Sequence, residues 1–222
     1  MKQVNKMSPY TGRVTTYHVL ASDTLIKHGS YTEVIGDKVL VSGYYDHGKK
    51  DSFWMENAPG ARPISSGSYR RGERIGKWEF YDGMGKLEQK YDFDKKELLF
   101  TTKEPPSYRF SVTMSETTPP DSIRMDPPLF IGGSYQYTRS LQREVMYPDM
   151  ERENDIGGRV VISFLVAADG TTSDYKVSKA VSPGLDKEAL RVVKMLNTWI
   201  PAKHNGQAVD AVVSTPIVFR LQ

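Results

Sequence analysis

The stretch that decides the fold is Arg159-Val160-Val161-Ile162-Ser163-Phe164-Leu165-Val166, which runs into a turn at Ala168-Asp169-Gly170. Its apolar residues recur at every second position and predict a β-strand with one wholly apolar face, made of Val160, Ile162, Phe164 and Val166. Asp169-Gly170 predicts a hairpin, because both residue types tolerate positive φ. In the return strand, Ser173 to Val181, we expect only one face to be buried, the one that carries Tyr175, Val177 and Val181.

A helix and a third strand follow this hairpin. Ser182-Pro183-Gly184 ends the strand pattern, Asp186 is the predicted N-cap of the helix, and Pro201 ends it. The helix carries an apolar stripe formed by Leu185, Ala189, Val192, Val193, Leu196 and Ile200. After a turn at Asn205-Gly206, the alternation from Val209 to Leu221 predicts the last strand.

The lengths of these elements determine their arrangement. A helix of about 14 residues rises roughly 20 Å, about the length of a strand, so it returns the chain and sets the last strand parallel to the second. The first strand fits between them, in the order 2-1-3, with the helix on one face. We therefore expect the outer edge of Val209–Leu221 to be unpaired.

This ordered set of features resembles the C-terminal domain of TonB-type energy transducers, in the branch common in Bacteroidetes-like envelope proteins. The resemblance covers residues 128–222 and rests on the strands and turns above and on further pieces: Phe130-Ile131-Gly132-Gly133, Tyr147-Pro148, Arg152-Glu153-Asn154, Ile156, Gly158, Gly184-Leu185-Asp186, Ala189, Trp199, Pro201, Pro216 and Phe219. Glu151, Asp155 and Ala202 depart from the family pattern, and we place them on loops or on the helix surface.

The resemblance implies a function in binding. Domains of this family capture a short extended peptide of an outer-membrane transporter on the edge of the last strand, by β-strand addition, with the Tyr-Pro segment near the peptide. Carried onto this sequence, the peptide-binding residues are Tyr147, Pro148, Val209, Ala211, Val212, Val213, Ser214, Thr215 and Ile217. The implied location is the periplasm or cell envelope, and the implied partner is a transporter peptide or another envelope protein.

Such transducers are anchored in the inner membrane, yet no apolar run in this sequence approaches the ~18 residues of a membrane span. We expect that a leader or anchor was removed and that Met1 is an added start; a protein without an anchor is the alternative. Contact with a membrane is expected only through an anchor outside this sequence.

The N-terminal part repeats with a period of 24 residues. Gly43 to Trp54 aligns with Gly67 to Trp78, Gly29-Ser30-Tyr31 fits the end of an earlier copy, and Gln89 to Lys96 starts a later one. Each unit predicts a hairpin with a glycine at its turn, and the set resembles MORN-type repeats in an antiparallel β-meander. The aromatic residues are expected to form a ladder on one face of the sheet: Tyr45, Trp54, Tyr69 and Trp78.

This aromatic ladder has two interpretations. It is a hydrophobic spine, which we favour, or it is a platform on which a glycan or lipid head-group stacks. Lys49-Lys50 and Arg70-Arg71 are interpreted as solvated turn charges, with a basic patch as the alternative.

The sequence predicts an α+β protein in three parts. Residues 1–102 form the MORN-like β-repeat domain, and residues 103–133 form a Pro-rich linker with one extra strand at Tyr108 to Met114. Residues 134–222 form the TonB C-terminal-like domain, which begins with a helix capped by Ser134.

Composition and motifs argue against most kinds of chemistry. The chain has 30 Lys and Arg against 27 Asp and Glu, without the clustered basic face of a nucleic-acid-binding protein. It has no cysteine, and its histidines are not spaced as metal ligands: His18, His28, His47 and His204. The acidic residues around Arg152 are interpreted as a solvated short helix: Asp149, Glu151, Glu153 and Asp155. We predict that the protein is not an enzyme and has no cofactor or metal.

Two functional hypotheses remain. The first is a periplasmic TonB-like adaptor that binds a transporter or envelope peptide and supports energy-dependent transport. The second is a non-enzymatic envelope scaffold, in which the MORN-like sheet is the binding module and the C-terminal domain forms a homodimer through its strand edges.

Overall fold

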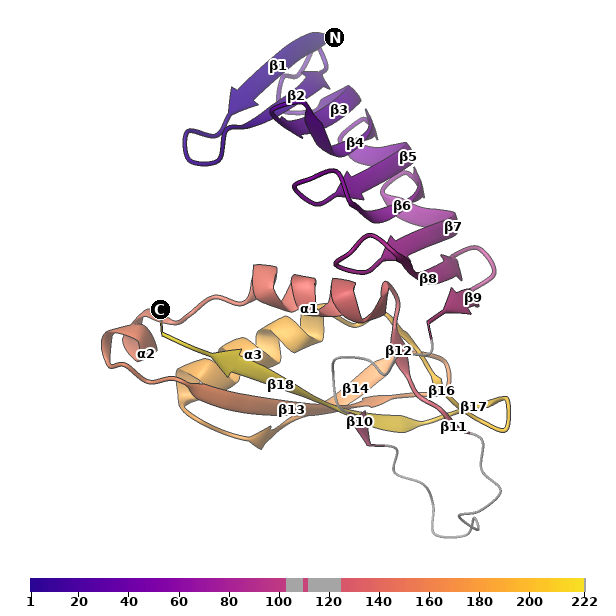
Figure 1. Cartoon of the computed structure of the whole chain (residues 1–222), viewed down its shortest axis with the longest axis vertical. Coiled ribbons are helices and arrows are strands. Elements are labelled where there is room, and N and C mark those ends of the chain that lie inside the picture. The colour runs from indigo at the N-terminus through magenta and orange to yellow at the C-terminus, as the bar shows by residue number, and fades with distance from the viewer. Residues whose placement is uncertain (103–109, 112–124, 222) are drawn as a thin grey trace. The chain divides into compact units, whose positions relative to one another are not determined.

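The computed structural model describes residues 1–102, 110–111 and 125–221. Contacts within the chain divide it into two compact units, Met1–Lys103 and Glu104–Gln222 (Figure 1). No helix among the described residues is long and apolar enough to cross a membrane.

The first unit is one antiparallel sheet whose strands follow each other in sequence order (Figure 1). The strands are β1 (Lys2–Met7), β2 (Arg13–Val19), β3 (Lys27–Ile35), β4 (Lys38–Asp46), β5 (Lys49–Asn57), β6 (Pro63–Arg70), β7 (Glu73–Tyr81), β8 (Leu87–Asp92) and β9 (Glu97–Thr101). The predicted β-meander is therefore confirmed.

Two tight turns of this sheet have the geometry that the repeat predicts. His47 and Gly48 between β4 and β5 have φ values of 43° and 81°, and Arg71 and Gly72 between β6 and β7 have 52° and 93°. Positive φ at both positions is the hallmark of the type I′ turn, whose twist matches that of the flanking strands.

The two tryptophans occupy equivalent places in adjacent units. The indole N–H of Trp54 donates to the carbonyl of Tyr44, and that of Trp78 donates to the carbonyl of Ser68, each over 3.1 Å. Each ring covers a glycine, Gly43 or Gly67, where an added Cβ would overlap the indole. The offset of 24 residues is thus present in side-chain packing as well as in sequence.

An aromatic ladder runs through this unit. Successive ring centroids lie 5.0 to 6.3 Å apart along Tyr17, Tyr31, Tyr45, Trp54, Tyr69, Trp78, Phe93 and Tyr91. Trp54 and Trp78 are almost fully buried. The ladder therefore takes the place of a globular core in this unit.

The second unit has two layers, a sheet with helices on one face (Figure 1). Its helices are α1 (Gly133–Glu144), α2 (Asp149–Glu153) and α3 (Pro183–Met195). The main sheet has the order β10-β18-β13-β14, formed by Phe110–Ser111, Ala211–Phe219, Gly158–Val166 and Thr172–Lys179. Strands β14 and β18 both run antiparallel to β13 and hence parallel to each other, which confirms the predicted order 2-1-3.

The core of this unit lies between the main sheet and the helices. The four inward residues predicted for β13 are at most 1% exposed. They pack with residues of α1, α3 and β18, and the rings of Phe130, Tyr137 and Phe164 all contact Trp199. For the return strand the prediction holds only at Tyr175, which is partly buried against the core. Val177 in β14 and Val181 beyond its end are each 36% exposed.

Helix α3 begins and ends earlier than the apolar stripe predicts. Its N-cap is Ser182, whose Oγ accepts a hydrogen bond from the N–H of Leu185, while the Asp186 carboxylate accepts from the N–H of Val181. Proline at the first turn fits this start, because its missing N–H has no partner there. Ile200 lies beyond the helix, in β15 (Trp199–Ile200), which pairs with β12 (Leu129–Phe130).

Two other predicted boundaries are also wrong. The N-cap of α1 is Gly132, at φ 126°, and not Ser134. The last strand is interrupted at Asp210: β17 (Gln207–Val209) pairs with β16 (Ala202–His204), and β18 starts at Ala211. The Asp210 carboxylate accepts a hydrogen bond from the N–H of Ala168. This bond links the residue between β17 and β18 to the turn that follows β13.

The described parts of the predicted linker pair with strands of the second unit. Phe110–Ser111 pairs with β18, β11 (Met125–Asp126) pairs with β16, and β12 pairs with β15. The rest of the strand predicted at Tyr108 to Met114 lies outside the described residues.

Candidate functional site

The outer edge of β18 is partly occupied. Along its inner edge β18 pairs with β13 from Ala211 to Phe219, and on its outer edge β10 pairs at Val213 and Val212 only. The prediction of an unpaired edge is therefore wrong at these two positions. Among the described residues, no strand pairs with residues 214–219 on that edge.

The side chains of β18 alternate between the core and the opposite face of the sheet. Four of the predicted peptide-binding residues point into the core and are at most 4% exposed: Ala211, Val213, Thr215 and Ile217. Val212 and Ser214 lie on the face away from the core and are half-buried. A peptide paired to this edge would contact the main chain of β18 on both kinds of residue. It would contact side chains only at the residues that face away from the core, Val212 and Ser214.

Val209 and Thr215 have structural contacts of their own. Val209 lies in β17 and pairs with Ala202, in a separate small sheet. The Thr215 hydroxyl accepts a hydrogen bond of 2.8 Å from Tyr137 Oη, and burial raises the pKa of Tyr137 well above its usual range. Tyr137 thereby fixes the middle of β18 to α1.

Tyr147 and Pro148 lie near the far end of the same strand. The Tyr147 hydroxyl donates to the carbonyl of Ile156 over 2.8 Å, and its ring meets the edge of Phe219 at a centroid distance of 5.7 Å. Pro148 is the N-cap of α2. The structure thus brings Tyr147 to the C-terminal end of β18, whereas β10 pairs near the N-terminal end.

Glu151 is a structural residue that the sequence interpretation missed. It is 8% exposed, and its Oε1 accepts hydrogen bonds of 2.9 Å from Ser182 Oγ and from the N–H of Gly184. A carboxylate at a helix N-terminus is stabilised by the unpaired N–H groups and the helix dipole. The interpretation of α2 as wholly solvated is therefore wrong at Glu151. Placing Ala202 on a surface is wrong too, since it is fully buried.

A second buried carboxylate fastens the segment that carries Tyr147. Glu188 on α3 pairs with Arg191 over 2.7 Å and accepts a hydrogen bond from the N–H of Met146. Arg191 also donates to the carbonyl of Glu144. The hydrogen bond from Arg191 and the bond from Met146 hold the pKa of Glu188 below its usual range, against the effect of its burial.

In the first unit, cationic side chains lie over the aromatic ladder at the spacing of the repeat. Lys27 lies over Tyr31, Lys50 over Trp54 and Arg74 over Trp78, at 5.0, 4.3 and 4.7 Å from the ring centroids. The interpretation of Lys50 as a solvated turn charge is therefore wrong. These cation–π contacts cover ring faces on which a ligand would stack, which favours the spine interpretation.

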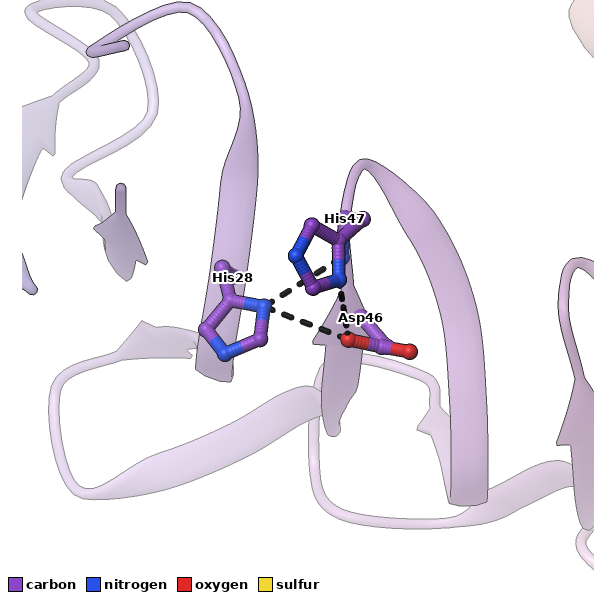
Figure 2. Close-up of side chains that lie close together, drawn as sticks. All are labelled: His28, Asp46 and His47. Atoms are coloured by element: carbon purple, nitrogen blue, oxygen red, sulfur yellow. Dashed lines mark hydrogen bonds and ion pairs between the residues drawn. The ribbon is translucent and has the colours of Figure 1, made fainter. Parts of the chain in front are cut away.

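Figure 2 shows three potential metal ligands that the strand register brings together: His28, Asp46 and His47. Gly29 of β3 pairs with Tyr45 of β4, which sets His28 beside Asp46. Asp46 Oδ1 lies 2.7 Å from His47 Nδ1 and 3.3 Å from His28 Nδ1. The spacing of the histidines in the sequence did not reveal that His28 and His47 lie side by side, with ring centroids 4.8 Å apart. Their separation of 19 residues has no helical period, and only the register of the β3–β4 hairpin would have revealed it.

Comparison with known proteins concerns the second unit. Residues 143–221 match the family described as Gram-negative bacterial TonB protein C-terminal. Domains of this family are non-enzymatic, mediate protein interaction and are in general periplasmic. The MORN-type resemblance of the first unit stays a prediction.

Two solved chains of Helicobacter pylori TonB-CTD, both from NMR solution structures, are similar to this chain. The chain of residues 179–285 is 27% identical, with 38% of this chain and 77% of that chain covered at a TM-score of 0.32. The chain of residues 194–285 is also 27% identical, with 39% and 91% covered at a TM-score of 0.32. No curated protein matches this chain.

Proposed function

We propose that the second unit binds an extended peptide of an outer-membrane transporter, or of another envelope protein, by strand addition to the outer edge of β18. The chain would act in the periplasm as a TonB-like adaptor in energy-dependent transport. The family match of residues 143–221 supports this class of function.

The observation that carries the proposal is the pairing of β10 with Val212 and Val213. This edge already accepts an antiparallel strand from the same chain. A pair of only two residues supplies few main-chain hydrogen bonds, so a longer peptide would gain more by pairing along β18. Such a peptide would displace β10 or continue past it along residues 214–219.

The burial pattern of β18 determines how the peptide would be recognised. The inward side chains belong to the core, so affinity would come from main-chain N–H and C=O groups. Selectivity would come from side chains on the face away from the core, next to Val212, Ser214 and Pro216, and from the region of Tyr147 at the far end of the strand.

The test is a titration of the full chain with short peptides from the N-terminal segments of outer-membrane transporters, followed by backbone amide shifts. Shifts are expected along residues 211–219 and near Tyr147. The direction of the backbone N–H groups alternates along a strand, so only one of the two variants Val213→Pro and Ser214→Pro removes an N–H that points to the outer edge. That variant should abolish binding. The other variant removes a hydrogen bond to β13 and should mainly destabilise the sheet.

Two results would count against the proposal. Unchanged peptide affinity in both proline variants would rule out strand addition at this edge. Concentration-dependent self-association without any response to peptide would favour the homodimeric scaffold instead.

A further inference from the structure

We propose that His28, Asp46 and His47 form a binding site for a divalent transition-metal ion, with Zn²⁺ as the ion that suits them best. Two imidazole nitrogens and one carboxylate oxygen are ligands that zinc takes in proteins. The site lies in the first unit, and it is independent of the function proposed for β18.

The distances suit a single ion. The potential ligand atoms all lie within 4.8 Å of one another, and Asp46 Oδ1 already contacts a nitrogen of each imidazole. Two ligand atoms on one tetrahedral zinc ion are about 3.3 Å apart, as follows from metal–ligand bonds of about 2.0–2.1 Å. Small side-chain rotations therefore bring the three atoms around one ion.

The backbone that carries these ligands is held in place, while the ligands remain accessible. The turn between β4 and β5 is fastened to β3 by a hydrogen bond of 2.7 Å from the N–H of Gly48 to the carbonyl of Lys27. The N–H of His47 donates a hydrogen bond of 3.3 Å to Nδ1 of His28, and an ion bound at that nitrogen would replace this hydrogen bond. The side chains of His28, Asp46 and His47 are 21%, 48% and 69% exposed, so an ion can enter from solvent.

The next repeat unit has the same backbone without the ligand set. There Asp51, Arg70 and Arg71 stand at the places of His28, Asp46 and His47. The N–H of Gly72 donates to the carbonyl of Lys50 over 2.7 Å, and the N–H of Arg71 donates to the Asp51 carboxylate over 3.2 Å. These contacts match those of Gly48 with Lys27 and of His47 with His28. The repeat therefore folds without histidines, and two arginines, which cannot ligate a metal, fill the equivalent places.

Three protein ligands leave a fourth position on a tetrahedral ion. Because the site faces solvent, water or a side chain of another molecule would fill this position. A bound ion would also cross-link β3 to the β4–β5 turn, so it would stabilise the first unit in proportion to its occupancy.

The test is calorimetric titration of the untagged full chain with ZnCl₂. The unaltered chain should bind one equivalent saturably. His47→Arg should weaken binding at least about tenfold. Mutations of residues that only orient the ligands of a metal already cause losses of that size, and this variant removes a ligand itself. Arg71 holds the equivalent turn position at φ 52°, so the backbone tolerates this replacement.

The repeat also supplies a complete exchange, H28D/D46R/H47R, which installs the residues of the next unit and should remove saturable binding. His204→Asn, which removes a histidine of the second unit, is the matched control and should bind Zn²⁺ as the unaltered chain does. In NMR spectra of the unaltered chain, zinc should shift the imidazole signals of His28 and His47 and not that of His204. Absence of saturable binding, or equal affinity in His47→Arg, would overturn the proposal.

Discussion

At the scale of single residues, the second unit depends on carboxylates that each fasten one element to another. Glu151 of α2 binds the N-terminus of α3, and Glu188 of α3 binds the segment that follows α1. Helix periodicity reveals neither role, because both residues fall where a helix pattern allows an exposed acid. The signal for Glu151 is Gly184: a glycine in the first turn of a helix is expected where a neighbouring group lies too close for a Cβ.

Gly184→Ala should destabilise the second unit by at least about 1 kcal/mol, because a buried group that loses its hydrogen bonds costs about 1–3 kcal/mol and a charged group costs more. The new Cβ would overlap the Glu151 carboxylate and drive it from Ser182 and the helix N-terminus. The loss of stability is measured by urea unfolding and by the rate of amide hydrogen exchange in β13. In the background of Glu151→Ala the same glycine change should cost far less, and strict additivity of the two changes would contradict the contact.

Glu188 predicts a specific acid sensitivity. Its pKa is lowered in the folded chain, chiefly by the hydrogen bond from Arg191, whereas an unfolded glutamate titrates at about 4.3. Its stabilising effect is therefore full above about pH 5 and is lost as the pH falls through the unfolded and then the folded value. Glu188→Gln should reduce the drop in stability between pH 7 and pH 3, measured by urea midpoints. An identical drop in both proteins would contradict this account.

At the scale of elements, the long periodic strands could be predicted from sequence, whereas the pairing of the short strands could not. The alternation in residues 159–166 gave β13 almost to its boundaries, and the glycine turns gave the hairpins of the first unit. β12 and β15 have two residues each, too few to show a period, and what defines them is the strand they pair with. A strand was predicted at Tyr108 to Met114, which includes β10, but nothing in its sequence indicated that it pairs with β18. This is why the occupied outer edge of β18 was missed. The break at Asp210 was missed because the alternation continues through it.

The repeat unit itself predicts a matched pair of mutational effects. Gly43→Ala and Gly67→Ala should each cost about 1–3 kcal/mol, as overpacking does, because the methyl group meets the ring of Trp54 or Trp78. Ser42→Ala, one residue earlier and on the other side of β4, should be nearly neutral. Thermal unfolding with tryptophan fluorescence distinguishes these outcomes. If either Gly43→Ala or Gly67→Ala left the stability unchanged, the two units would not be equivalent.

At the scale of the whole molecule, the chain consists of two units with different principles of stability, an aromatic ladder in one and a layered core in the other. We propose that residues 125–133 belong to the second unit. Phe130 is part of its core, and the sequence predicted them as linker because their prolines and glycines hide the pairing of β11 and β12.

Two fragments test this assignment. A fragment of residues 134–222 loses Phe130 and should be less stable than one of residues 125–222 by about 3–5 kcal/mol, the cost of removing a buried phenylalanine ring. Comparison of their urea midpoints measures the difference. Equal stability of the two fragments would contradict this assignment and would favour the prediction that residues 125–133 are part of the linker.

The central claim is that the outer edge of β18 accepts a peptide in place of β10, and isotope-filtered NOE spectroscopy tests it most directly. With labelled chain and unlabelled transporter peptide, we expect cross-strand contacts between peptide backbone protons and those of Val212 and Val213, together with loss of the contacts from Phe110 and Ser111. Peptide contacts confined to side chains elsewhere, with the β10 pairing unchanged, would contradict strand addition at this edge.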